Sequence, residues 1–521
     1  MSLSSEEAAP EETARLAGME ELQPLDRHNL ALARAVHPSG WVNPRPRGRY
    51  NLVVLGGGTA GLVCAAAAAG LGARVALVER RLLGGDCLNV GCVPSKALIR
   101  SARAVAAARD GARFGLRATP VPEVDFSAVM ERMRRLRAQI APHDAAERFR
   151  ELGVDVFFGT GRFTGPRQIG VGDARLNFAR AVIATGARAA APPIPGLDAV
   201  GYLTHETIFS LTEVPRTLGV IGAGPIGCEM AQVFARFGSK VVLIESAHGV
   251  LPREDRQAAG IVQAALERDG VEIHCCGKQL EVLPGSRGPR LRLVSHQSRH
   301  ELEVERILVA VGRAPNVDGL ELDQAGIGWG PGGVEVDDRL RTRNRAVYAA
   351  GDVCSRFKFT HAADAMARIV VRNALFAGRE KVSSLIIPWC TYTSPELAQV
   401  GVNQEQVRES GREVATIRVE MADVDRAVLD DATEGFVKIH YRRGSDRIVG
   451  ATIVAARAGE LISGISVAMH AGAGLSTLSR SIHPYPTRGE VLRRAGDGWN
   501  RTRLSPRLKR VFDAWLRWQR R

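Results

Sequence analysis

Two cysteines separated by four residues carry the clearest chemical signal of this 521-residue chain. Cys87 and Cys92 lie in the segment GGDCLNVGCVPSK, and Lys96 follows Cys92 by about one helical turn. The intervening residues can form a helix start that brings the two sulfurs together. Backbone amides and Lys96 would then favour a thiolate. A thiol pair of this kind can accept a reducing equivalent and pass it on.

A glycine-rich loop precedes the cysteines, and a similar loop occurs again downstream. The apolar run Tyr50–Leu55 leads into GGGTAG at 56–61, which opens a helical stretch, and a second apolar run then ends at Glu79. The same order recurs around GAGPIG at 222–227, which is followed by Glu245. Each copy therefore predicts a strand, a helix and a second parallel strand.

The two loops predict two dinucleotide sites. Each can place a pyrophosphate on a helix N-terminus and a ribose hydroxyl on the acid that ends the next strand, Glu79 or Glu245. A carboxylate at Glu245 would repel a 2′-phosphate, which favours NADH over NADPH at the second site. Arg253 lies close to Glu245 in the sequence and would weaken this preference.

Charge and cysteine content limit the classes of function. The formal net charge of +14 could attract nucleic acid, anionic lipid or phosphorylated cofactors. Outside the C-terminal tail the excess charge is scattered and no recognised motif accompanies it, so no nucleic-acid partner is predicted.

The first 24 residues contain no apolar core of signal-peptide length, which predicts a cytoplasmic protein. Eight cysteines in such a chain indicate redox or metal chemistry rather than a disulfide framework. The alanine-rich stretch 62–71 is too short to span a membrane and predicts a buried helix.

Several motifs together resemble the flavin-dependent pyridine nucleotide-disulfide oxidoreductases, class I. They are the cysteine segment, the two glycine loops, Ala184-Thr185-Gly186, the segment VGRAPN at 311–316 and the segment YAAGD at 348–352. The resemblance covers residues 50 to about 498. It implies an α/β fold with two Rossmann-like dinucleotide-binding domains, for FAD and NAD(P), and a C-terminal α+β interface domain that forms a homodimer.

The resemblance assigns roles residue by residue. Cys92 would face the flavin, Cys87 would meet the substrate, and Lys96 would pair with Glu229 beside the flavin ring. In a homodimer, Tyr485 and Glu490 would reach the thiols of the partner. The FAD-binding residues would be Gly56, Gly58, Gly61, Glu79, Lys96, Thr185, Gly186 and Asp352. The residues for the nicotinamide cofactor would be Gly222, Gly224, Gly227, Glu245 and Gly312.

The predicted organisation follows from the same motifs and from boundary signals in the chain. Proline-rich residues at 191–196, glycine-rich residues at 326–333 and a change of pattern after Pro388 mark the boundaries. The predicted segments are an N-terminal extension (1–48), the first part of the FAD domain (49–195), the NAD(P) domain (196–326), the second part of the FAD domain (327–386), the dimerisation domain (387–498) and a basic amphipathic helix (499–521).

The C-terminal segment departs from the disulfide reductases. Those enzymes carry His-Pro-Thr-x-x-Glu, in which the histidine protonates the departing thiolate, whereas this chain has Tyr485-Pro486-Thr487 followed by Glu490. A phenol with a pKa near 10 is a poor proton shuttle at neutral pH. His483, two residues earlier, is the other imidazole available in this segment, and a structural role is the better interpretation of it. The Pro-Tyr-x-Thr pattern resembles that of mercuric reductase.

The predicted activity is therefore mercuric-reductase-like, with FAD, NADH or NADPH and a soft metal ion such as Hg(II) or a thiol-linked substrate. Cys87 and Cys92 would bind Hg(II) transiently, because soft thiolates suit it. No structural metal is predicted. The vicinal pair Cys275-Cys276 is interpreted as structural, and the chain ends without the vicinal cysteines typical of mercuric reductases.

Two alternatives stay open. One is a dihydrolipoamide dehydrogenase-like disulfide oxidoreductase. The other is a membrane-associated flavoprotein with a mainly binding or regulatory role, because residues 499–521 combine apolar side chains with eight Lys or Arg at near-helical spacing. A helix that docks on its own domain or on a partner subunit explains the same pattern.

Overall fold

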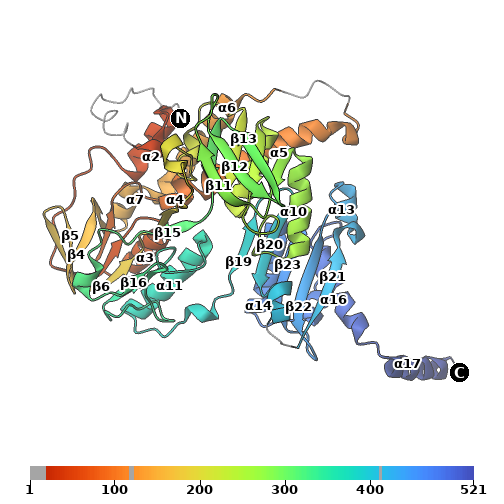
Figure 1. Ribbon diagram of the computed structural model, residues 1–521. Helices are drawn as coiled ribbons and strands as arrows, with labels where there is room; N and C mark the ends of the chain where they lie inside the picture. Colours follow the sequence, from red (N-terminus) through yellow and green to blue (C-terminus); the bar gives the residue numbers. More distant parts are fainter. Residues whose placement is uncertain (1–18, 117–122, 410–412, 521) are drawn as a thin grey trace. The chain divides into compact units, whose positions relative to one another are not determined.

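The computed structural model describes residues 19–116, 123–409 and 413–520 (Figure 1). The chain has the mixed α/β fold expected from its two glycine loops. It divides into two compact units. The first holds the described residues up to Gly222, with Val233–Ile244 and Gly277–Leu385. The second holds Ala223–Gln232, Glu245–Cys276 and the described residues from Ile386 onwards. The acidic start of the N-terminal extension, residues 1–18, lies outside the described residues.

A largely parallel sheet forms the centre of the first unit, and its strands are apolar because both faces are covered. The parallel strands are β3 (Val154–Phe158), β2 (Val75–Glu79), β1 (Arg49–Leu55), β6 (Ala174–Ile183) and β18 (Val347–Ala349). The antiparallel strands β5 (Gln168–Val171) and β4 (Gly161–Gly165) complete the sheet. Ile183 lies opposite both Leu55 and Ala349. The segments that follow β1, β6 and β18 therefore leave the sheet at the same edge.

Helices cover this sheet and begin at the segments that the motifs predict. The alanine-rich α3 (Thr59–Gly70) is a buried helix, as expected, and packs against α11 (Thr360–Leu375). Among the described residues, no helix combines the length and the apolar character that crossing a bilayer requires. The other helices of this unit are α2 (Arg27–Val36), α4 (Gly85–Asn89), α5 (Cys92–Arg109), α6 (Phe126–Ile140), α7 (Ala146–Glu151) and α8 (Leu197–Val200).

The described part of the N-terminal extension packs on the first unit. Asp26 caps α2 and accepts a hydrogen bond from Arg134 at 2.5 Å. Arg137, which is 1% exposed, donates to the side chain of Asn29 at 2.6 Å and to the carbonyl oxygen of Asn89 at 2.5 Å. Burial lowers the pKa of Arg137 to about 10. This arginine therefore ties the extension to the end of α4, the helix that carries Cys87.

The second strand-helix-strand repeat is also present. β8 (Thr217–Ile221) pairs in parallel with β9 (Lys240–Ile244) and β14 (Arg306–Val309). Short antiparallel pairings accompany them. These involve β11 (Lys278–Leu283), β12 (Arg290–Ser295), β13 (Ser298–Glu303), β7 (Ala187–Ala189), β15 (Arg313–Pro315), β16 (Trp329–Gly330) and β17 (Gly333–Val334). The remaining elements between residues 222 and 276 are α9 (Pro225–Arg236), α10 (Arg256–Arg268) and β10 (Val271–His274).

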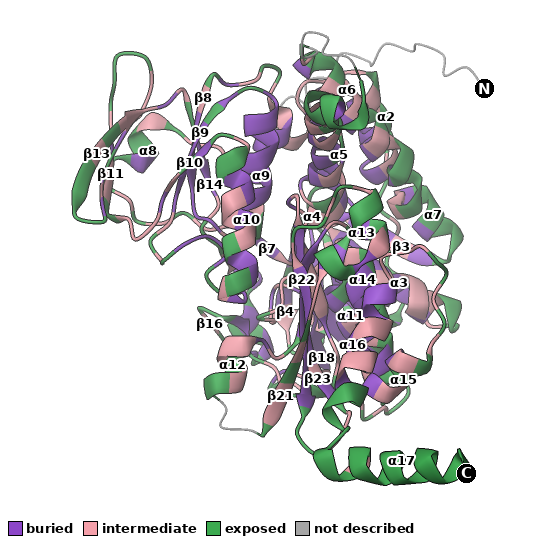
Figure 2. Ribbon diagram, turned by 90° about the vertical axis from the view of Figure 1, so that its right-hand side faces the viewer, coloured by how far each residue is buried: buried purple, intermediate pink, exposed green. Residues whose placement is uncertain are grey.

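A five-stranded antiparallel sheet forms the core of the second unit, and its inner strands are almost fully buried (Figure 2). Its strands, in spatial order, are β19 (Pro388–Thr391), β20 (Glu396–Gly401), β23 (Ile448–Ala455), β22 (Phe436–Arg442) and β21 (Val414–Glu420). The helices after residue 386 are α12 (Gln404–Glu409), α13 (Asp425–Leu429), α14 (Ala458–His470), α15 (Leu475–Arg480), α16 (Glu490–Thr502) and α17 (Pro506–Gln519). α17 has no buried residue.

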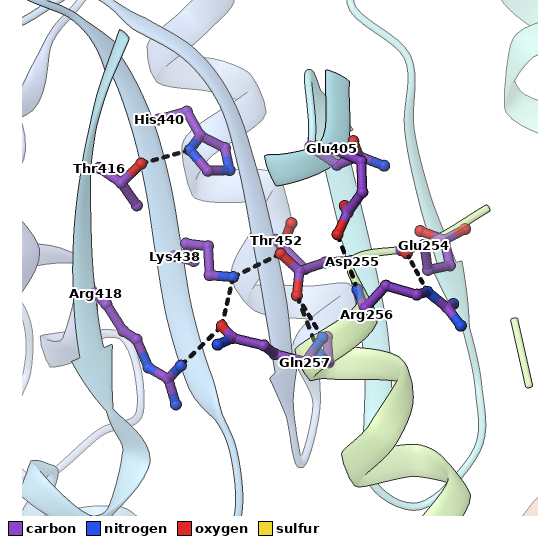
Figure 3. Close-up of polar contacts among 12 residues, drawn as sticks. Glu254, Asp255, Arg256, Gln257, Glu405, Thr416, Arg418, Lys438, His440 and Thr452 are labelled. Carbon is purple, nitrogen blue, oxygen red and sulfur yellow. Dashed lines mark hydrogen bonds and ion pairs between the residues drawn. The ribbon is translucent and has the colours of Figure 1, made fainter. Parts of the chain in front are cut away.

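A buried polar cluster joins the start of α10 to this sheet (Figure 3). Lys438 on β22 donates to Asp255 at 2.6 Å and to the side-chain oxygen of Gln257 at 2.9 Å. Asp255 is 0% exposed and also caps α10 by accepting from the backbone N–H groups of Gln257 and Ala258. The charges compensate each other inside the protein, so the cluster holds α10 in one position on the sheet.

Candidate redox and dinucleotide site

The first glycine loop crosses the strand edge of the first unit in a conformation that only glycine tolerates. Gly56 has φ +104°, and a Cβ atom there would lie 2.3 Å from the carbonyl oxygen of Ala184. The backbone N–H of Gly57 donates to Glu79 at 2.6 Å, and the other carboxylate oxygen accepts from the N–H of Arg81 at 2.7 Å. Burial raises the pKa of Glu79. The loop and its strand-end acid therefore form one rigid cradle, which fits the adenosine end of a dinucleotide.

The cysteine segment begins in direct contact with this loop. The backbone N–H of Gly84 donates to the carbonyl oxygen of Gly57 at 2.8 Å. Gly85 has φ +54°, and a Cβ atom there would lie 2.7 Å from the Cα atom of Gly58, the N-cap residue of α3. A contact between two glycines thus places the cysteine segment next to the glycine loop at 56–61.

The two cysteines meet at the junction of two helices. Cys87 lies in α4, and Cys92 is the first residue of α5. A hydrogen bond between their side chains, together with burial, raises the pKa of Cys87. Cys92 is exposed, and its Sγ atom lies 3.4 Å from the hydroxyl of Thr360, the first residue of α11. A helix N-terminus favours a thiolate electrostatically, so Cys92 is the better placed of the two to carry negative charge.

Lys96 and Glu229 stand in different units, and their pairing stays a prediction. The Lys96 ammonium group donates to the hydroxyl of Ser95 at 3.3 Å. Glu229 is 5% exposed, lies on α9 and accepts a hydrogen bond from the backbone N–H of Tyr392 at 2.8 Å. Each side chain is therefore held in place within its own unit.

A chain of charged groups runs beside the cysteine helix, and sequence reasoning missed most of it. Arg313 contacts Asp86, the neighbour of Cys87, and its Nε atom lies 3.5 Å from Asp352. The Nε2 atom of His205 lies 3.5 Å from the carboxylate oxygen of Asp86 that Arg313 also contacts. Burial raises the pKa of Asp352 and lowers the pKa values of Arg313 and His205. Asp86 and Arg313 lie inside the cysteine segment and VGRAPN, so the motifs contained them, whereas no local pattern indicated His205.

The other residues assigned to FAD gather at the same edge of the first unit. The hydroxyl of Thr185 donates to the carbonyl oxygen of Asn316 at 2.7 Å, and the Asn316 amide donates back to the carbonyl oxygen of Thr185 at 3.0 Å. Gly186 accepts from the N–H of Asn316 at 3.0 Å. Asp352 follows β18, and Lys358 donates to its carbonyl oxygen at 2.8 Å. Gly61 lies in the first turn of α3. The glycine loop at 56–61 with Glu79, together with Asp352, fits FAD, whose adenosine and pyrophosphate parts need such groups.

The second glycine loop repeats the geometry of the first. The backbone N–H of Ala223 donates to Glu245 at 2.8 Å, and the N–H of Ala247 donates to the other oxygen of the same carboxylate at 2.9 Å. Glu245 therefore occupies the position at the second loop that Glu79 occupies at the first. The remaining predicted residues are Gly222, which directly follows β8, Gly224, which precedes α9, Gly227 within α9 and Gly312 between β14 and β15.

The C-terminal segment places a phenol where the disulfide reductases carry an imidazole. Tyr485 is 72% exposed and donates a hydrogen bond to Asp425 at 3.0 Å, which raises the pKa of the phenol. Arg494 lies 3.4 Å from Asp425 and 3.1 Å from the buried Glu490. The Nε2 atom of His483 is buried and makes no hydrogen bond among the described residues. The contact between Asp425 and Tyr485, which are 60 residues apart, was not predicted from the sequence.

The comparisons with known proteins agree with the motifs. Residues 50–367 match the pyridine nucleotide-disulphide oxidoreductase family, whose members use FAD and NAD(P)H. Residues 387–495 match the dimerisation domain of the same family, which indicates a homodimer.

Individual relatives lie in two groups of this family. The chain is 34% identical to a mercuric reductase of Streptomyces lividans over 453 residues, which cover 86% of this chain and 95% of that protein. It is 33% identical to a dihydrolipoyl dehydrogenase of Thermus scotoductus over 458 residues, which cover 86% and 97% of the two chains.

Solved structures give the same result. The HOCl-induced flavoprotein disulfide reductase RclA from Escherichia coli superposes with a TM-score of 0.75 at 29% identity, and the match covers 86% of this chain and 99% of that chain. LpdA from Mycobacterium tuberculosis superposes with a TM-score of 0.78 at 26% identity, over 86% and 98% of the chains. With the family match extending over more than half of its length, the chain belongs to the pyridine nucleotide-disulphide oxidoreductase family.

Proposed function

We propose that this protein is an FAD-dependent NAD(P)H oxidoreductase whose Cys87/Cys92 dithiol serves the reduction of a soft metal ion such as Hg(II), or of a thiol-linked substrate. The observation that carries the proposal is Tyr485, a phenol bound to Asp425 where the disulfide reductases place an imidazole. The identity of 32 to 34% to several mercuric reductases supports it.

The proton balance of the two candidate reactions explains why this residue matters. Reduction of a disulfide by NAD(P)H yields two thiols and consumes one proton, so an acid must protonate the departing thiolate. Reduction of Hg(II) by NAD(P)H yields Hg(0) and NAD(P)⁺ and releases one proton. A phenol titrates near pH 10 without perturbation, and Asp425 raises the pKa of Tyr485 further. Tyr485 is therefore a poor acid for the first reaction, and the second reaction does not need one.

The residues of this chain take distinct roles in the proposed reaction. Bound FAD would pass the two electrons of a hydride from NAD(P)H to the dithiol. Cys92, at the start of α5, faces the flavin as a thiolate, and Cys87 meets the substrate. Lys96 pairs with Glu229 beside the flavin ring. Two thiolates are soft ligands, so the same pair holds Hg(II) during its reduction.

NADH is the proposed electron donor. Glu245 is fixed by two backbone N–H groups in the position of a ribose acceptor, where its charge would repel the 2′-phosphate of NADPH. A homodimer in which Tyr485 and Glu490 complete the site of the partner is part of the same proposal.

A panel of electron acceptors tests the proposal. We expect Hg(II)-dependent NADH oxidation to exceed lipoamide- and glutathione-dependent oxidation, and Cys87→Ala to abolish it, whereas the control Cys390→Ala retains it. Preferred turnover of lipoamide would instead identify a dihydrolipoamide dehydrogenase-like enzyme, the alternative supported by the 33% identity to such an enzyme.

A second candidate function, binding to an anionic membrane surface, rests on α17. None of its residues is buried, and basic side chains accompany the exposed Val511, Phe512, Trp515, Leu516 and Trp518. Truncation after residue 503 should abolish binding to vesicles that contain phosphatidylserine and leave the reductase activity intact. Equal binding by the truncated protein would refute this candidate.

A further inference from the structure

A second group of thiols lies in the loops that follow β9 and β10, within the second unit. Cys275 and Cys276 directly follow β10, and His248 lies in the loop after β9. The two sulfur atoms and a ring nitrogen of His248 all lie within 4.8 Å of one another. The Sγ atom of Cys276 is 3.6 Å from Nδ1 of His248.

We propose that His248, Cys275 and Cys276 form a binding site for a thiophilic divalent cation with a filled d shell, such as Zn(II), Cd(II) or Hg(II). Two thiolates and an imidazole make a soft ligand set that selects such ions over Mg(II) or Ca(II). Three protein ligands leave the fourth tetrahedral position open for water or a further ligand. This assignment replaces the interpretation of the vicinal cysteines as purely structural.

The distances suit a metal centre after a small adjustment. Metal–sulfur bonds of about 2.3 Å and metal–nitrogen bonds of about 2.0 Å place tetrahedral ligand atoms roughly 3.5 to 3.8 Å apart. The separation between Cys276 and His248 already has this value. No separation in the group exceeds it by more than about 1 Å. The side chain of His248 is exposed, and small rotations of the three ligand side chains about their χ angles can close the remaining gap.

One backbone hydrogen bond joins the two loops, and the side chain of Arg256 holds the loop of His248, before any metal binds. The N–H of Cys276 donates to the carbonyl oxygen of Ala247 at 2.9 Å. Arg256 donates to the carbonyl oxygen of His248 at 3.2 Å. Cys276 has φ +56°, a conformation that costs a side chain of its type on the order of 1 kcal/mol or more. The ligands are therefore brought together by the fold itself, which lowers the entropy lost on binding.

The proposed binding step is not a redox reaction and does not depend on the proposed reductase activity. The metal ion forms two bonds to sulfur and one to nitrogen, and the two thiols release two protons to solvent. Affinity should therefore rise with pH.

Cadmium binding by the full-length, flavin-containing protein tests this inference. Because Cys87 and Cys92 would also bind Cd(II), the titration uses the variant with Cys87→Ser and Cys92→Ser, freshly reduced with a phosphine. Equilibrium dialysis should find one tightly bound Cd(II) per chain, and cadmium NMR should show sulfur ligation. Adding Cys276→Ser or His248→Ala should weaken this binding at least about tenfold, because each removes one of three ligands.

The matched control is Cys390→Ser, which removes a partly buried thiol elsewhere in the same unit. It should leave Cd(II) affinity unchanged. Retained flavin content and an unchanged circular dichroism spectrum establish that each variant is folded. The inference is overturned if the Cys87→Ser/Cys92→Ser variant binds no Cd(II), or if adding Cys276→Ser or His248→Ala leaves the affinity for Cd(II) as high as in that background. Either result can be told apart from failure of the proposed reductase activity, since these proteins lack the redox thiols.

Discussion

The close contact between Gly85 and Gly58 allows the cysteine segment to pack against the glycine loop at 56–61, and a larger residue at position 85 should disturb this packing. In Gly85→Ala the new Cβ atom would lie 2.7 Å from the Cα atom of Gly58. Both partners are backbone-anchored, so no flexible side chain can move aside. The strain must shift the GGGTAG loop or the start of α4 by several tenths of an ångström.

Two effects lower the free energy of unfolding of Gly85→Ala: backbone strain at position 85 and steric overlap with Gly58. A matched control variant separates them. Alanine at φ +54° costs about 1 to 2 kcal/mol relative to glycine. Overpacking against Gly58 costs a further ~1 to 3 kcal/mol. Gly172, with φ +53° and nothing within 4 Å of its virtual Cβ atom, bears only the first cost. The difference between the two variants therefore measures the glycine-on-glycine contact.

Urea unfolding and retention of flavin after dialysis provide the measurements. Gly172→Ala should lose about 1 to 2 kcal/mol of unfolding free energy and bind FAD as the wild type does. Gly85→Ala should lose ~1 to 3 kcal/mol more and bind FAD at least about tenfold more weakly, because the glycine loop at 56–61, the proposed pyrophosphate site, is displaced. Equal stability and equal flavin retention in the two variants would refute the reasoning.

Four further variants test other parts of the structure. Lys438→Met leaves the buried Asp255 without its cation and should lower the free energy of unfolding in urea by about 3 to 5 kcal/mol. The control Arg268→Met removes an exposed ion pair with Glu434 and should lower it by less than ~1 kcal/mol. Similar losses in the two variants would contradict the role given to the buried pair. Burial lowers the pKa of His440 to about 4, so only the unfolded chain takes up a proton at this residue as the pH falls below about 6.5. The free energy of unfolding should therefore fall by roughly 3 kcal/mol between pH 6.5 and 4. The variant His440→Gln should lack this pH dependence. Glu245→Ser should reduce the ratio of kcat/KM for NADH over NADPH by about tenfold or more, and an unchanged ratio would remove Glu245 from cofactor selection. Tyr485→His should raise lipoamide reduction by about tenfold or more without a matching gain in Hg(II) reduction, since it supplies a proton donor; no gain would argue against the proton-balance explanation.

Local patterns predicted the parts of the fold that local forces determine. The two glycine loops, the strand-end acids Glu79 and Glu245 and the buried alanine-rich helix all follow from spacing and apolar runs of fewer than 30 residues. A helix does start between Cys87 and Cys92, with Gly91 as the N-cap of α5, whereas the short helix α4 that carries Cys87 was not predicted.

Contacts between distant segments could not be predicted in this way. Asp86 and Arg313 are 227 residues apart, and Asp255 and Lys438 are 183 residues apart. Their pairing depends on how strands and helices pack, which periodicity does not report. A buried charge needs a partner, so the burial of Lys438 within strand 436–442 requires a carboxylate nearby, but the sequence does not indicate which one.

The contacts of Tyr485 bear on what this side chain can contribute to a reaction. The carboxylate of Asp425 accepts its hydroxyl proton in a hydrogen bond and raises the pKa of the phenol, so the side chain stays neutral throughout the physiological pH range. The same carboxylate beside an imidazole would stabilise the protonated ring and create an acid that titrates near neutrality. Replacement of the imidazole by a phenol therefore turns the group next to Asp425 from a proton donor into a fixed hydrogen-bonding hydroxyl. Such a hydroxyl can orient a substrate at the thiols. It is less suited to a substrate whose leaving group must be protonated.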